Sequence, residues 1–101
     1  MTNSVIEVVT FKLAENVSET QFLDSARAVN AFLDASEGFV RRHLSVAENG
    51  VWTEHIEWQS MEQAKSASEK LMQFEAAGPF MAAIDVESVA MGHNALKMSH
   101  A

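Results

Sequence analysis

The stretch FVRRHLSVAENGVWTEHIEW, residues 39–58, decides the fold of this 101-residue chain. Near its centre, Asn49-Gly50 is a dipeptide typical of a two-residue β-turn, because both residue types tolerate the positive φ that such a turn requires. Apolar and polar residues alternate on both sides of the turn, which predicts paired strands over 39–47 and 51–58. The sequence therefore predicts a β-hairpin in the middle of the chain.

Two helices are marked by the residues at their starts. Ser18 with Gln21, and Ser60 with Gln63, have the three-residue spacing of a capping box. An apolar stripe at helical spacing follows each pair, and Gly38 is a natural stop for the first helix. One helix is therefore predicted before the hairpin and one after it.

Strands are predicted at both ends of the chain as well. Residues 5–13 are mostly β-branched and apolar, and residues 86–96 form the last apolar stretch with strand character. The resulting order, βαββαβ, predicts one α+β domain over residues 1–101. Its architecture is a ferredoxin-like antiparallel sheet with both helices on one face.

Alternation along the hairpin sorts its side chains onto two faces. If Asn49-Gly50 is the whole turn, Trp52 and Trp58 share one face, and Leu44 and Val46 lie on the other, against the helices. The tryptophan face is predicted to mix apolar with charged groups: Phe39, Arg41, His43, Glu54 and Ile56, with Phe11 from the first strand. Large aromatic side chains on an uncovered face would be too extensive an apolar patch for a monomer. A second copy of the chain is the simplest cover, so we predict a homodimer formed through this sheet face, with a cavity among its polar groups.

Composition excludes several partners. The formal net charge is −7, with seven Lys and Arg against fourteen Asp and Glu, which disfavours binding to nucleic acid or to an anionic membrane. Met1 to Ser4 lack the basic stretch and apolar segment of a signal peptide, so a cytoplasmic location is expected. There is no cysteine, and His43 and His55 are predicted on opposite faces. No metal site is therefore expected.

The run Ile56–Ala64, IEWQSMEQA, resembles the strand-end motif of antibiotic-biosynthesis-monooxygenase-like proteins, a Trp-x-Ser followed by an acidic amphipathic helix. With the order of the elements, the resemblance covers nearly the whole chain. It implies a dimeric α+β barrel, in which two sheets pack around a cavity in each protomer and Trp58 lies on the cavity side. Some such proteins oxidise polycyclic aromatic substrates with O₂ and no cofactor, others degrade heme, and many have no known activity.

The sequence departs from the heme-degrading members of this family at two positions. Those members carry an asparagine in the first strand and a histidine in the second helix, where this chain has Val9 and Ser68. Heme degradation is therefore not expected, and no cofactor is predicted.

On the predicted tryptophan face, His43 is the candidate general base and Glu54 the carboxylate that orients it. Arg41 is a candidate clamp for an anionic or planar ligand, and Trp52 and Trp58 are candidate walls of its pocket. Phe11 is a further predicted ligand contact. The same residues also fit a structural interpretation, in which the polar pair satisfies itself at a dimer interface and the aromatic residues anchor it.

Two hypotheses about function follow. The first is a cofactor-independent monooxygenase or isomerase that acts on a small planar or aromatic metabolite. The second is a non-catalytic homodimeric binding or stress-response module for an unknown ligand. The sequence leaves both open, because no phosphate loop, metal cluster or activated nucleophile accompanies these residues.

Overall fold

The helices begin where the serine caps predict. In the computed structural model, which describes residues 4–101, Ser18 Oγ accepts a hydrogen bond from the backbone N–H of Gln21 (3.1 Å), and the Gln21 side chain accepts one from the Ser18 N–H (2.9 Å). Ser60 caps the later helix through the Gln63 N–H (3.1 Å), but Gln63 Oε1 accepts from the Ser60 hydroxyl instead of its N–H (3.2 Å). Both starts are confirmed, the second without the reciprocal backbone bond of a full capping box. Met1–Asn3, on which the signal-peptide prediction partly rests, lie outside the described residues.

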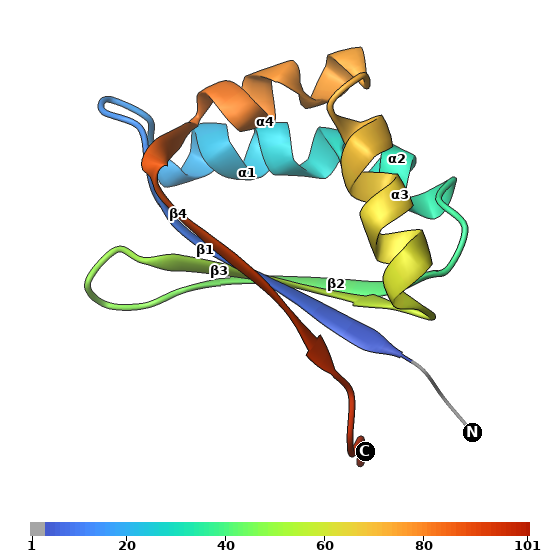
Figure 1. The fold of residues 1–101 in the computed structure, drawn as a ribbon. Coiled ribbons are helices and arrows are strands. Elements are labelled where there is room, and N and C mark those ends of the chain that lie inside the picture. Colours follow the sequence, from blue (N-terminus) through green and yellow to red (C-terminus); the bar gives the residue numbers. More distant parts are fainter. Residues whose placement is uncertain (1–3) are drawn as a thin grey trace.

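The element order is the predicted one, with three short helical segments added. In chain order the elements are β1 (Val5–Leu13), α1 (Glu19–Ala28), α2 (Asn30–Asp34), β2 (Phe39–Val46), β3 (Trp52–Trp58), α3 (Met61–Leu71), η1 (Glu75–Ala77), α4 (Gly78–Ala82) and β4 (Ile84–Ala95). The strands form one antiparallel sheet in the order β2-β3-β1-β4. Among the described residues, all helices lie on one side of this sheet, and none of them covers its other face (Figure 1). The ferredoxin-like fold is confirmed.

The hydrophobic core lies between the sheet and the helices. At its centre the Phe22 ring is fully buried and meets the rings of Phe11, Trp52 and Phe80 at centroid distances of 5.6, 4.8 and 5.5 Å. Small residues on α3, Ala64 and Ala67, are buried against the same cluster. Their size lets the helix lie close to the sheet, so the large rings of the strands fill the space below it.

The predicted assignment of the sheet faces is right for β2, where Leu44 packs against the core beneath the helices, but wrong for β1 and β3. Trp52 and Trp58 are 5% and 2% exposed and belong to the core beneath the chain's own helices. They therefore need no second copy of the chain to remove them from water. Val46, which was predicted to face the helices, pairs with Trp52 on that side and is 44% exposed because it lies beside the hairpin loop.

The hairpin register explains this error, because it sets which side chains of β3 share a face with those of β2. The turn is a three-residue loop, because Ala47 N–H donates to Val51 O (2.9 Å) and Val46 pairs with Trp52. Gly50 takes φ +86, as the last residue of a three-residue hairpin loop commonly does. The extra loop residue moves β2 by one position relative to β3. A bulge between Phe39 and Arg41 shifts the register by one more residue, so that Phe39, and not Arg41 as predicted, pairs with Trp58.

A one-residue shift moves the side chains of β3 to the opposite face relative to those of β2. Arg42 and Leu44 now pair with Ile56 and Glu54 on the helix-covered side, whereas His43 pairs with His55 on the uncovered side. Within residues 4–101, no helix is both long enough and apolar enough to cross a membrane.

Candidate functional site

Two carboxylates are buried in the core between the sheet and the helices. Glu7 of β1 is 8% exposed and Glu54 of β3 is 6% exposed, and they are the buried charged residues of the part of the chain that the structure describes. Removing a carboxylate from water is costly unless it is paired or protonated. Each of the two therefore has partners that account for its position, and these partners define the candidate site.

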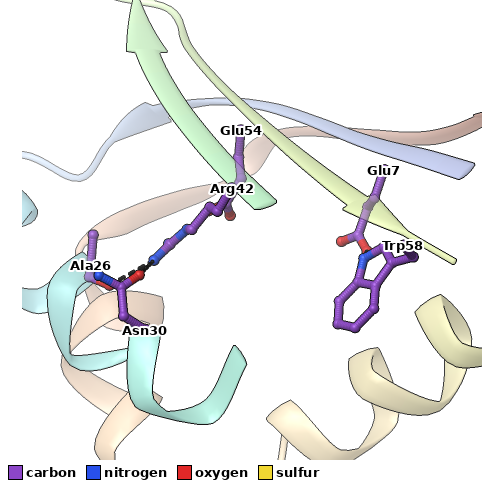
Figure 2. Close-up of polar contacts among 6 residues, drawn as sticks. All are labelled: Glu7, Ala26, Asn30, Arg42, Glu54 and Trp58. Atoms are coloured by element: carbon purple, nitrogen blue, oxygen red, sulfur yellow. Dashed lines mark hydrogen bonds and ion pairs between the residues drawn. The ribbon is translucent and has the colours of Figure 1, made fainter. Parts of the chain in front are cut away.

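Arg42 pairs with Glu54. The Arg42 Nε donates to Glu54 Oε2, and both side chains are more than nine-tenths buried. Arg42 Nη1 also donates to the Ala26 carbonyl oxygen (2.8 Å) and to Asn30 Oδ1 (3.0 Å), so α1 and α2 hold the guanidinium in place (Figure 2). The Phe80 ring lies 5.4 Å from the guanidinium carbon. The result is a rigid buried ion pair that ties the hairpin to the helices.

Glu7 is held by Trp58. The Trp58 Nε1–H donates to Glu7 Oε1 at 3.1 Å, and both side chains extend from the strands toward the helices (Figure 2). His93 of β4 brings its Nε2 to 3.9 Å from the same oxygen. Burial raises the pKa of Glu7, the nearby charge of Glu54 raises it further, and the hydrogen bond from Trp58 opposes them. Glu7 is thus a carboxylate shifted toward holding a proton.

Two buried polar atoms at this site have no hydrogen-bond partner among the described residues: Arg42 Nη2 and His93 Nε2. A buried polar atom without a partner costs stability, and most native structures contain few of them. Here both belong to the groups that surround the two carboxylates.

A hollow lies beside the start of α3. It has a volume of about 540 Å³ and lies between the segment after α2 and the N-terminal half of α3. Its lining residues are Phe32, Ala35, Ser36, Glu37, Ser60, Glu62, Gln63, Ser66, Ala67 and Lys70. The volume lies in the range of small-molecule sites, which are usually about 300–1,000 Å³. A smaller pocket of about 180 Å³, between α1 and β2, reaches Arg42.

The structure separates the residues that the sequence placed together. His43 and Glu54 lie on opposite faces of the sheet, so the predicted base and orienting carboxylate cannot touch. Arg41 forms an ion pair with Glu57 (3.3 Å) on the uncovered face and does not stack on Trp58. Arg41 and His43 do remain together, in a pocket of about 270 Å³ on that face.

The three aromatic candidates lie on the helix-covered face. Phe11 and Trp52 pack against Phe22 in the centre of the core, where they fill space and line none of the pockets described here. The Trp58 ring packs against Phe39 at a centroid distance of 5.9 Å. Of the three, Trp58 is the one that also makes a polar contact, its hydrogen bond to Glu7.

Sequence reasoning missed Arg42, His93 and the role of Glu7. The alternation of β1 does put Glu7 on the tryptophan face, so that residue had a visible signal. The register shift hid the pairing of Arg42 with Glu54, and the pairing of His93 with Glu7 depends on a β1–β4 register that no turn fixes. Among the described residues no group of three or more His, Asp or Glu side chains could hold a metal ion.

Comparison with known proteins bears on this geometry. No protein-family model matches the sequence, and no curated protein matches it. Among solved structures, the chain is similar to SnoaB from Streptomyces nogalater, described as a cofactor-independent oxygenase, at 16% identity over 97% of both chains and a TM-score of 0.79. The chain shares its fold with this protein. The resemblance predicted from Trp58-Gln59-Ser60 is therefore confirmed for the fold.

Two further structures show the same architecture. A candidate antibiotic biosynthesis monooxygenase from Bordetella bronchiseptica is 12% identical, over 96% of this chain and 100% of that one, with a TM-score of 0.78. A protein from an uncultured marine organism, described as a dimeric ferredoxin-like protein, is 11% identical over 98% and 92% of the two chains, with a TM-score of 0.65. At such identities the agreement concerns the fold alone.

Proposed function

We propose that this monooxygenase-fold chain is a cofactor-independent oxygenase for a small planar molecule that carries a weakly acidic C–H bond. The observation that carries the proposal is the buried cluster of Glu7, Trp58 and His93, with a carboxylate of raised pKa beside an unpaired imidazole nitrogen. Titratable groups whose pKa is shifted by burial and by a specific partner are common at functional sites. SnoaB, which has this fold, is described as a cofactor-independent oxygenase, and this supports the choice of reaction.

The proposed chemistry starts with a proton transfer. Glu7 takes the proton of the substrate C–H bond, and the burial that raises its pKa makes it a stronger base than an exposed carboxylate. The carbanion reduces O₂ and forms a C–O bond, and the resulting peroxide receives the proton back. Loss of the second C–H proton with cleavage of the O–O bond then yields a carbonyl and water. Each oxygen atom of O₂ is accounted for, and the substrate supplies all the electrons.

The other residues have positioning roles in this proposal. Trp58 fixes the Glu7 carboxylate through its indole N–H, and His93 Nε2, 3.9 Å away, is a second proton carrier. The Arg42–Glu54 pair holds the Arg42 guanidinium in place between the sheet and the helices. The hollow beside α3 is lined by Phe32 and Ala67 but by none of Glu7, Trp58 and His93, so in this proposal it would hold the part of the substrate that lies away from the reacting carbon.

We also infer that the uncovered sheet face pairs with a second copy of the chain. No helix of the described residues covers it, and its middle carries Ile6 and Val8 between more polar neighbours. A neighbouring structure of the same fold is described as dimeric, which supports this arrangement. The paired surface would be the face of Arg41 and His43, and the tryptophan face would stay inside each protomer.

An oxygen-uptake assay tests the enzyme hypothesis against the binding module. Anthrone, a planar molecule with an acidified methylene group, is the probe, and its carbonyl product absorbs at a different wavelength. We expect the purified full chain, treated with a chelator and given no cofactor, to consume O₂ and form anthraquinone in equal amounts. Binding of anthrone, measured by quenching of tryptophan fluorescence, without O₂ uptake above the protein-free rate would contradict the proposal and favour the binding module.

A further inference from the structure

Two histidines lie opposite each other on the uncovered face of the sheet. His43 of β2 pairs with His55 of β3, and Val8 of β1 pairs with His55 from the other side. Both histidine side chains line one pocket of about 270 Å³ on this face. Sequence analysis placed them on opposite faces, and the three-residue hairpin loop brings them together. The surface that is proposed to pair with a second copy of the chain therefore carries two adjacent titratable groups.

The surroundings of the two histidines offer them no unpaired carboxylate. Arg41 and Glu57 line the same pocket and pair with each other at 3.3 Å. The other side chains of this row of the sheet and of its two neighbouring rows carry no charge; they belong to Ile6, Val8, Thr10, Ser45, Thr53 and Asn94. Among the described residues neither imidazole takes part in a hydrogen bond or an ion pair. A positive charge on either ring would therefore have no free counter-ion within these rows.

We propose that protonation of His43 and His55 switches off the pairing of two chains through this face, an inference that rests on the proposed dimer. Histidine side chains gain a positive charge as the pH falls from about 7.5 to about 5.5. In the separate chain these charges face water, because both residues are exposed. In the dimer they are removed from water, which is costly for a charge without a partner.

The two-fold symmetry of such a dimer increases the effect. Each chain presents the same surface to its partner, so four imidazoles enter the interface and no unpaired carboxylate comes with them. Removal from water also strengthens the repulsion between like charges that lie opposite each other on paired strands. The separate chain thus binds these protons more readily than the dimer does. By linkage, the dimer is most stable above the ordinary titration range of histidine and weakens as the pH falls through it.

Sedimentation velocity of the full chain at about pH 7.5 and about pH 5.5 tests this switch. We expect a dimer at the higher pH and a rise in its Kd of about tenfold or more at the lower one. One pH unit below the ordinary histidine value of about 6.5, each imidazole that the dimer keeps neutral raises the Kd by about tenfold. The double variant His43→Gln with His55→Gln, whose side chains are polar but take up no proton, should remain dimeric at both pH values. His100→Gln, a matched control in the C-terminal segment, should keep the response of wild type.

Tryptophan fluorescence separates dissociation from unfolding. Trp52 and Trp58 are buried inside each protomer, so their emission should stay unchanged when the dimer dissociates. A red shift at the lower pH would mean that acid unfolds the chain, and it would contradict the switch.

The sedimentation results also distinguish the switch from the dimer on which it rests. A chain that stays single at pH about 7.5 would overturn both. A dimer with the same Kd at both pH values, or one whose response survives in the double variant, would overturn the switch alone. The oxygenase proposal is independent of these outcomes, because Glu7 and Trp58 lie on the other face of the sheet.

Discussion

Replacement of Glu54 by leucine should lower the free energy of unfolding by about 3–5 kcal/mol, the usual cost of removing one partner of a buried ion pair. The variant leaves the Arg42 guanidinium charged and nine-tenths buried without its carboxylate. The two oxygens that still accept from Arg42, those of Ala26 and Asn30, carry no full charge. Urea unfolding followed by tryptophan fluorescence measures the loss.

Two comparisons show whether the loss comes from the unpaired charge. The double variant Arg42→Met with Glu54→Leu removes both charges and should recover most of the stability, because an apolar pair of similar volume can replace a buried ion pair. Asp24→Ala breaks the exposed pair with Arg27, whose side chains are 71% and 67% exposed, and should cost no more than about 1 kcal/mol. If Glu54→Leu proves as mild as Asp24→Ala, Arg42 is not held as the structure shows.

Glu7→Gln should separate activity from stability. Glutamine keeps the size of the side chain and an oxygen that can accept from the Trp58 N–H, but it cannot take up a proton. Under the proposed function kcat/KM should therefore fall by about 10²- to 10⁴-fold, the usual contribution of a general base. The folded protein should at the same time become more stable at neutral pH, because a buried negative charge has been removed.

The direction of the pH dependence follows from the raised pKa of Glu7. A folded-state pKa above the ordinary value of 4.5 means that the folded chain binds this proton more tightly than the unfolded chain does. The stability it confers is fully present below pH 4.5 and is lost as the pH rises through the raised pKa. The stability of wild type relative to Glu7→Gln should accordingly decline over that interval.

Glu57→Gln is the matched control for Glu7→Gln. It makes the same chemical change on the neighbouring strand, and the Glu57 side chain points to the uncovered face, where its partner is Arg41. We expect its kcat/KM to stay close to wild type. Equal losses of activity in the two variants would mean that Glu7 has no special role in the reaction.

Most of the fold could be predicted from local signals. The serine caps at Ser18 and Ser60 fixed the helix starts, and alternation fixed the strands, because these features depend on residues near in sequence. The short helices α2 and α4 were harder to predict. Each has only five residues, too few for a periodic pattern, and neither has a side-chain cap.

The faces of β1 and β3 could not be predicted, because their relation to β2 depends on one residue in the hairpin loop. Asn49-Gly50 fits a two-residue turn as well as the last part of a three-residue loop, and Glu48 gives no sign of which one forms. The bulge near Val40 has no sequence marker either. The candidate base therefore moved from His43 to Glu7, while Trp58 kept its place at the site.

The hydrogen bond from Trp58 to Glu7 inside the helix-covered face is the central claim, and an ¹H–¹⁵N NMR titration of the two tryptophan indoles tests it most directly. The Trp58 indole signal should move with pH, with its inflection above the ordinary glutamate value of 4.5, and its proton should exchange slowly with water. The Trp52 indole, buried among aromatic rings, should stay unchanged over the same range. A Trp58 signal that does not respond to pH, or that exchanges rapidly with solvent, would contradict the account.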